Sequence, residues 1–239
     1  MEELKMRDSK KPVELMKYIG KNEYIMFWEK TFLSAAHWFS EIPEFAELDL
    51  DVKIEILKST WMVRARLEKL AETADLQRKR EMSSGVYMLT DDSCVELEKV
   101  EVDLSWCTNY STEQMQFYCL PDSDTYWKES VEALINLKPT NVELNFMLIH
   151  LCLCDAGKRN RGKVQEAADS LLQIQCDNLH DYYSKSRNTS HYSGRLAQMM
   201  KVNKLIEKGI RMRREKNCIA KLFDVFSVDF SHPEMFDLT

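Results

Sequence analysis

Apolar and aromatic residues recur every three or four positions along most of the chain, the spacing that places them on one face of an α-helix. The first such run covers residues 13–40 and predicts a buried helix. Its apolar positions include Tyr24, Phe27, Trp28, Phe32, Ala35, Ala36 and Phe39. Pro43 must break this helix and hold Ile42, the residue before it, in an extended conformation.

The same periodicity predicts further helices over residues 52–76, 127–137, 164–183 and 193–214. Residues 140–154 are apolar on nearly every side, which is typical of a helix enclosed by others. Asp49 or Asp51 is suited to cap the start of the second helix. Residues 1–12 are polar and predict an extension ahead of one domain over residues 13–239.

Residues 83–104 differ from this helical pattern. Val86, Tyr87 and Met88 precede a Thr-Asp-Asp-Ser turn, and spaced apolar residues follow the turn, so the stretch predicts one short β-hairpin. The chain of 239 residues holds only six Gly and five Pro, which favours long helices over many tight turns. The sequence therefore predicts an all-α protein with a single small hairpin.

Composition and charge narrow the classes of function. Hydrophobic residues make up 44% and charged residues 30%, as in an ordinary globular protein. The net charge of −6 would repel a phosphate backbone, so no nucleic acid contact is expected of this domain. No apolar run reaches the roughly 18 residues of a membrane span. The seven cysteines are odd in number and lack a C-x-x-C spacing, which favours a reduced, intracellular compartment.

No motif for catalysis or for metal binding stands out. His150, Cys152 and Cys154 attract attention, but on a helix residues 150 and 154 share a face while residue 152 points away. The sequence has no phosphate-binding G-x-x-x-x-G-K-[ST] loop and no G-x-S-x-G motif. We therefore expect a non-enzymatic domain without a metal or cofactor.

Residues 38–61 (WFSEIPEFAELDLDVKIEILKSTW) carry a specific pattern of two Trp, a Pro, a Phe and spaced aliphatic residues. This stretch resembles the signature of nuclear receptor ligand-binding domains, without a gap. The positions in register are Trp38, Ile42, Pro43, Phe45, Leu48, Ile54, Leu57, Lys58 and Trp61. Weaker similarity extends over most of the chain, and the Lys- and Met-rich divergent ends are similar to the enlarged orphan receptor groups of nematodes.

The resemblance implies a three-layer antiparallel helical sandwich of about ten to twelve helices. It also implies a nuclear protein that regulates transcription, in which docking of a C-terminal helix recruits coregulators. The alternative is a ligand-independent scaffold for interaction or dimerisation, with the same fold and a filled pocket. Copurification of a lipid would distinguish the two.

The family binds coregulators through an L-x-x-L-L helix, held in a groove by a charge at each end. When the family's groove positions are transferred to this sequence, Ile54 and Leu57 are expected to form the floor of the groove. The lysine that usually ends the third helix corresponds to Ser40, so Lys53 or Lys58 would supply the cation. Glu234 is the candidate for the glutamate of the last helix. The alternative is that these lysines are solvated and that the tail is frayed.

The family also holds a small lipophilic ligand, such as a fatty acid or a sterol. By register, the pocket would be bordered by Tyr24, Phe27, Trp28, Thr31, Phe32, Met62, Ala65 and Arg66. A buried Arg66 would anchor a ligand carboxylate, since a buried guanidinium must be paired. Alternatively, Phe27 and Trp28 fill the pocket, and Arg66 pairs with an internal glutamate such as Glu29 or points to solvent. The arginine that the family often carries eleven residues after the second Trp is Glu72 here, which argues against an acidic ligand.

Residues 193–214 correspond to the helix through which the family dimerises. The apolar stripe of this region comprises Leu196, Met199, Met200, Leu205, Ile206 and Ile210. A homodimer or a heterodimer would use this stripe. Ordinary packing against a neighbouring helix explains part of it without a partner.

Overall fold

The computed structural model describes residues 13–119, 125–187 and 191–237, and the expected extension over residues 1–12 lies outside them. The chain is mostly helical. The α-helices are α1 (Lys21–Ser40), α2 (Pro43–Ala46), α3 (Leu50–Arg78), α4 (Thr112–Cys119), α5 (Thr125–Leu137), α6 (Asn141–Arg159), α7 (Lys163–Asp181) and α8 (Ser193–Leu222). A π-helical turn, η2 (Tyr182–Ser186), continues α7, and a 3-10 turn, η3 (Pro233–Phe236), lies near the end of the chain. The described residues thus hold eight α-helices rather than ten to twelve.

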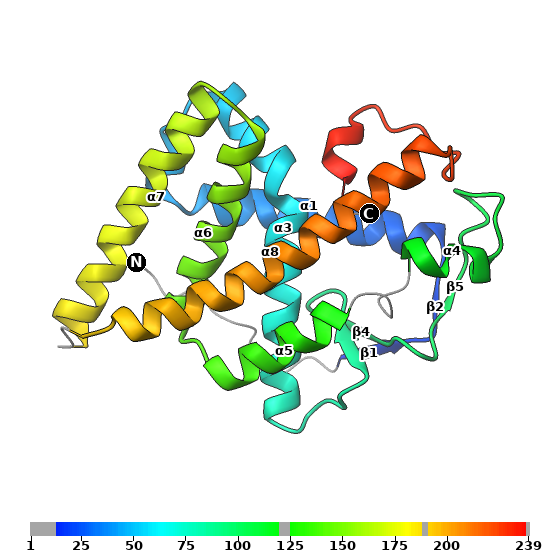
Figure 1. Cartoon of the computed structure of the whole chain (residues 1–239), viewed down its shortest axis with the longest axis horizontal. Helices are drawn as coiled ribbons and strands as arrows, with labels where there is room; N and C mark the ends of the chain where they lie inside the picture. Colours follow the sequence, from blue (N-terminus) through cyan, green and yellow to red (C-terminus); the bar gives the residue numbers. More distant parts are fainter. Residues whose placement is uncertain (1–12, 120–124, 188–190, 238–239) are drawn as a thin grey trace.

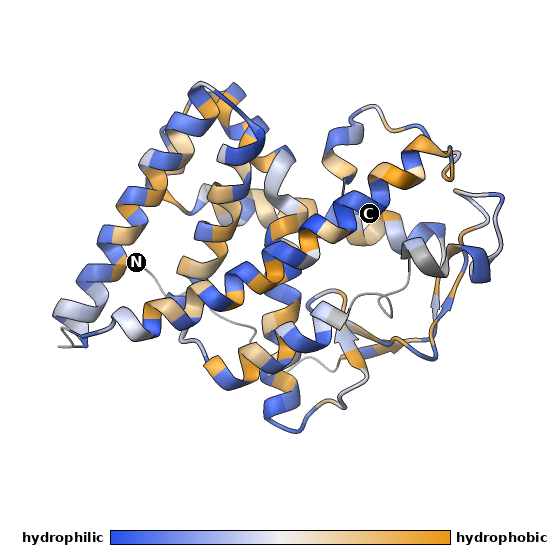
Figure 2. Cartoon of the chain, in the orientation of Figure 1, coloured by the Kyte–Doolittle hydropathy of each residue, from blue (hydrophilic) through white to orange (hydrophobic). Residues whose placement is uncertain are grey.

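The helices are arranged in layers around α3. In Figure 1, α3 and α6 stand next to each other, α8 and α5 pass in front of α3, and α1 passes behind it. Helix α7 packs along α6 at the edge of the molecule. Hydrophobic and hydrophilic residues alternate in bands along α3, α5 and α8, as expected for amphipathic helices (Figure 2).

Helix α6 forms part of the centre of the core, as its apolar sequence predicts. Its buried apolar residues are Leu144, Phe146, Met147, Leu148, Ile149, Leu151, Cys152, Leu153 and Ala156. The Thr140 hydroxyl accepts from the backbone N–H of Glu143, and the Glu143 carboxylate accepts from the backbone N–H of Thr140. This capping box fixes where the helix begins.

The turn between α1 and α3 follows the expected course. Helix α1 ends at Ser40, Ile42 is extended with φ −88° and ψ 109°, and Pro43 is the first residue of α2. The rings of Phe39 and Phe45 stack with centroids 4.8 Å apart, which fixes the loop to the core. Asp49 occupies the N-cap position of α3, but its side chain makes no capping hydrogen bond.

The predicted hairpin is present as β3 (Val86–Met88) and β4 (Ser93–Glu96), which pair antiparallel. The expectation of a single hairpin is wrong, however. Strand β1 (Glu14–Met16) pairs in parallel with β4, and β2 (Tyr18–Ile19) pairs in parallel with β5 (Glu101–Val102).

The predicted helix over residues 13–40 is therefore correct only from Lys21 onward. Gly20 ends the strand segment, and its N–H donates to the Glu23 carboxylate at 2.9 Å, which caps the start of α1. Strands of two and three residues are too short to show the alternation that identifies a strand. The apolar residues of β1 and β2 therefore merge with the helical pattern that follows.

Candidate functional site

The turn η3 is held by side chains from three helices. Three consecutive backbone carbonyls, of Glu234, Met235 and Phe236, each accept a hydrogen bond from such a side chain. The donors are Arg159 Nη2 of α6 at 3.4 Å, Trp61 Nε1 of α3 at 2.9 Å and Asn217 Nδ2 of α8 at 3.1 Å. The carbonyls that a short helical turn leaves unpaired are thereby satisfied.

Glu234 is paired rather than frayed. Its Oε1 lies 3.0 Å from Lys58 Nζ of α3 and 3.2 Å from His232 Nδ1. The backbone N–H of Glu234 and the Lys58 ammonium lower the pKa of this carboxyl to about 2. Lys58 is also 3.2 Å from Glu55, and hydrogen bonds to Glu234 and Glu55 raise its pKa.

The other proposed groove residues lie at the surface of α1 and α3. Ile54 is 44% exposed and Leu57 is half-buried. Ser40 is exposed, and its hydroxyl donates to the backbone carbonyl of His37 at 2.6 Å. Lys53 Nζ donates to the carbonyl of Ala46 at 2.6 Å. Of the two candidate lysines, Lys58 thus binds Glu234, whereas Lys53 binds the end of α2.

A network of four charged residues fixes the end of the described chain. Asp155 of α6 accepts two hydrogen bonds from Arg214 of α8, at 2.6 and 2.7 Å. The Asp237 carboxylate accepts from Arg214 Nε at 2.7 Å and lies 3.1 Å from Arg159 Nη2. These half-buried ion pairs between arginine and aspartate side chains link α6 and α8 to the residue that follows η3.

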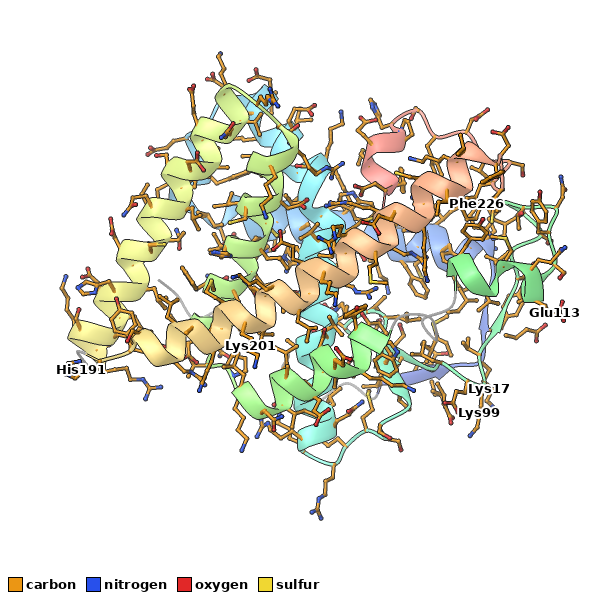
Figure 3. The ribbon with its side chains drawn as sticks, in the orientation of Figure 1. Lys17, Lys99, Glu113, His191, Lys201 and Phe226 are labelled. Carbon is orange, nitrogen blue, oxygen red and sulfur yellow. The ribbon has the colours of Figure 1, made fainter. Side chains whose placement is uncertain are left out.

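The segment between α8 and η3 is also fixed to the molecule. Thr108 Oγ1 donates to the carbonyl of Val225 at 2.6 Å, and the N–H of Ser227 donates to the carbonyl of Cys107 at 2.8 Å. Phe226, between these two contacts, lies beside the C-terminal end of α8 (Figure 3). It packs against a small second core that includes Cys107 and Val225.

Three of the proposed ligand residues belong to an aromatic cluster that the end of the chain completes. The ring of Phe236 lies 5.0 Å from Trp28, 5.7 Å from Trp61 and 4.3 Å from Phe230, measured between centroids. Trp28 also contacts Phe230 at 5.6 Å. Tyr24 packs on Trp28, and Phe32 packs on Trp61. The cluster therefore covers the part of α1 and α3 where a ligand was expected.

All eight proposed ligand residues are half-buried. None of them lines the cavity of about 910 Å³ that the structure contains. That cavity lies at the C-terminal half of α3, against β1, β3 and the start of α6, and Glu72 is among its lining residues.

The buried guanidinium of α3 belongs to Arg64 rather than to Arg66. Arg64 is 3% exposed, donates to both oxygens of Glu68 at 2.7 and 2.8 Å, and stacks 5.1 Å from the ring of Trp38. Sequence reasoning missed it because Arg64 and Arg66 are two residues apart and point in directions that differ by about 200° around the helix. Only the packing of α1 on α3 decides which of them faces inward.

The apolar stripe of α8 is used by the chain itself. Met199, Ile206 and Ile210 are buried, and the other three residues of the stripe are half-buried. Helix α8 packs on α5 and α6 rather than mainly on α7. The packing of one chain thus accounts for this stripe.

His150 and Cys154 share a face of α6, as predicted, with Sγ 3.8 Å from Nε2, while Cys152 points toward the Thr60 carbonyl of α3. Burial raises the pKa of Cys154. Within residues 13–119, 125–187 and 191–237, no group of three or more His, Cys, Asp or Glu side chains is placed to hold a metal ion. Over the same residues, no helix combines the length and the apolar character that crossing a membrane requires.

The structure is thus a layered helical domain with two small sheets and a docked C-terminal turn. The family model for the ligand-binding domain of nuclear hormone receptor matches residues 9–223. The chain is 50% identical over 239 residues to nuclear hormone receptor family member nhr-133 of Caenorhabditis elegans, covering all of this chain and 59% of that protein. It is 45% identical over 233 residues to member nhr-96 of the same organism, covering 98% and 58%. The chain therefore belongs to the nuclear hormone receptor ligand-binding domain family.

The chain spans about three fifths of the length of these curated relatives. Members of this family are receptors that regulate transcription rather than enzymes, in agreement with the sequence analysis. The expected similarity to nematode receptors is confirmed by relatives from C. elegans.

Proposed function

We propose that this domain recruits L-x-x-L-L coregulator helices to a nuclear transcription factor, through a groove bordered by α1, α3 and η3. The observation that carries the proposal is the ion pair between Lys58 and Glu234. It holds a carboxylate at the surface, and the adjoining helices expose two large apolar side chains, Ile54 of α3 at 44% and Leu33 of α1 at 58%. Exposed apolar residues together with a fixed carboxylate suit an amphipathic helix whose N-terminus needs an anion.

We infer different roles for the two lysines. Lys58 binds Glu234 at 3.0 Å, so these two residues cannot hold opposite ends of one peptide helix. Lys58 instead orients Glu234 at the N-terminal end of the peptide. Lys53 lies five residues earlier on α3, about 7.5 Å along the axis, and is the cation for the peptide's C-terminal carbonyls. An ammonium has three N–H donors, so binding to Ala46 leaves two for a peptide.

The aromatic cluster favours ligand-independent docking of η3. Phe230 and Phe236 supply apolar area against Trp28 and Trp61 that a lipophilic ligand would otherwise supply. In this form of the proposal, the sequence itself biases the last turn toward the docked state. A fatty acid or sterol is then not needed for recruitment.

Dimerisation is a separate part of the proposal. Because the stripe over residues 193–214 is packed within the chain, a homodimer or heterodimer through this region would use the outward-facing polar side chains of α8, such as Lys201 and Lys204. Such a contact would be salt-sensitive.

Fluorescence anisotropy with a labelled L-x-x-L-L peptide tests the groove. Ile54→Arg is expected to abolish binding, and Glu234→Gln to weaken it about tenfold, the effect of losing one charge-assisted hydrogen bond. Ile25→Arg is the matched control, because Ile25 on α1 is 45% exposed and lies outside the groove. Equal binding by the two arginine variants would refute the proposed site.

A further inference from the structure

The lining of the cavity of about 910 Å³ combines apolar side chains with the carboxylate of Glu72. Ala71, Ala74, Met88, Leu134 and Leu144 give it apolar surface from α3, β3, α5 and α6. The carboxylate of Glu72, on α3, lies among them and is 19% exposed. The volume is that of a site for a drug-sized molecule.

The charges around Glu72 do not balance. Lys69, which is 9% exposed, binds Glu72 Oε2 at 3.0 Å and also binds Asp91 of the β3–β4 turn. One ammonium is thus shared by two carboxylates, and Glu68 on the next turn of α3 is occupied by Arg64. When Glu72 is ionised, the group formed by Lys69, Glu72 and Asp91 carries one excess negative charge.

One oxygen of Glu72 is available to a ligand. Among the described residues, Lys69 is the hydrogen-bond partner of this carboxylate, through Oε2. Within the part of the chain that the structure describes, the fully buried side-chain atoms that lack a partner are Arg64 Nε and Asn203 Oδ1, so Glu72 Oε1 is not fully buried. Because Glu72 lines the cavity, Oε1 is the oxygen with which a ligand could pair.

Burial, together with Glu68 and Asp91, raises the pKa of Glu72 to about 7, although Lys69 opposes this shift. A carboxylate in such an environment is stabilised by a further positive charge. Of the three cations in the cavity lining, Arg78 and Lys79 both bind Asp75, and Lys138 is exposed to solvent.

We propose that this cavity binds a small amphipathic amine, with its ammonium group on Glu72 Oε1 and its hydrocarbon part against the apolar wall. Solvent screens the exposed cations at the cavity edge. The less exposed carboxylate of Glu72 therefore determines which charge a bound ligand carries. This site is independent of the coregulator groove and shares no residue with the eight ligand residues expected from register.

Isothermal titration calorimetry with dodecylamine and dodecanoate at pH 8, below their micelle concentrations, tests the site. Dodecylamine is expected to bind at least about tenfold more tightly than dodecanoate, the effect of one charge-assisted hydrogen bond. Glu72→Gln is expected to remove this preference. Glu81→Gln, a change of the same type at an exposed lining residue, is expected to leave it intact.

A second pair of variants locates the binding. Ser83 is exposed and lines the cavity, so Ser83→Trp is expected to block entry without disturbing the core. Ser84→Trp, next to it but not in the lining, is the control. The proposal is overturned if wild type binds no amine, if dodecanoate binds as tightly, or if Glu72→Gln or Ser83→Trp binds amine as wild type does. L-x-x-L-L binding measured on the same variants tests the groove separately.

Discussion

The indole N–H of Trp61 donates a hydrogen bond of 2.9 Å to the backbone carbonyl of Met235, 174 residues further along the chain. Trp61 is 1% exposed and is the second Trp of the family signature. Its N–H is thus a buried donor whose partner is supplied by the last turn of the described chain. Docking of η3 therefore supplies the hydrogen-bond acceptor that this buried indole N–H needs.

Replacing Trp61 by Phe is expected to loosen η3 more than the rest of the fold. The change removes the donor to Met235 and part of the ring area, so we expect a loss of about 1–2 kcal/mol in the free energy of unfolding. Hydrogen exchange of residues 230–237 is expected to accelerate. Trp127→Phe is the control, because Trp127 is also buried but packs against Tyr87 in another part of the core. Equal exchange in the two variants would contradict the coupling.

How far the sequence predicts this fold depends on how local each signal is. Pro43 and Trp38 have consequences within a few residues, and the path from α1 to α3 follows from them as predicted. The pairing of Glu14 with Ser93 depends on a strand 79 residues away, and β1 was therefore missed. The choice of Arg64 over Arg66 as the buried arginine depends on the packing of α1.

The candidate site shows the same limit. Similarity to the family suggested Glu234 and two candidate lysines. It could not indicate which lysine pairs with Glu234, because that depends on where η3 lies. Ser231 and His232 interrupt the apolar residues before Glu234, so the local sequence does not indicate a docked turn. The residues that anchor it by ring contacts are Phe230 and Phe236, whose partners lie on α1 and α3. No local spacing indicates such partners.

If Phe236 fills the place of a ligand, shortening it should create a space that a small aromatic compound can occupy. Phe236→Ala is expected to cost about 2–3 kcal/mol in the free energy of unfolding, less than the roughly 3–5 kcal/mol of a fully buried Phe because this ring is half-buried. Benzene or indole is expected to raise the melting temperature of this variant and not that of wild type. Phe223→Ala is the control, since Phe223 is 66% exposed. An unchanged melting temperature with either compound would argue against a filled pocket.

The paired charges at Asp155 are expected to stabilise the docked turn. Asp155→Asn leaves the half-buried Arg214 with Asp237 alone and removes two charge-assisted hydrogen bonds. We expect a loss of about 2–3 kcal/mol by urea unfolding, with faster proteolysis near residues 225–237. Asp169→Asn, at an exposed position of α7, serves as the control and is expected to stay within about 0.5 kcal/mol of wild type. Equal stability of both variants would show that these ion pairs add nothing measurable to the free energy of unfolding.

Stability in acid is expected to depend on Glu143. This carboxylate is 3% exposed and accepts from Arg195 Nε and Nη2, each at 2.7 Å, from the N–H of Thr140 and from the hydroxyl of Tyr183. These donors outweigh burial, which alone would raise the pKa, and lower the pKa of Glu143 from 4.5 to about 2. A lowered pKa in the folded state means that the ionised carboxylate stabilises the fold. This contribution is fully present above pH 4.5 and is lost as the pH falls toward 2.

Glu143→Gln is therefore expected to be less stable than wild type at pH 7, by on the order of 3 kcal/mol. The difference between the two proteins is expected to shrink below pH 4.5 and to vanish near pH 2. Urea unfolding at pH 7, 4 and 2.5 measures it, with Glu132→Gln, at an exposed position of α5, expected to follow wild type throughout. A stability difference that stays constant with pH would mean that the shape of the side chain at residue 143, rather than its charge, stabilises the contact between α6 and α8.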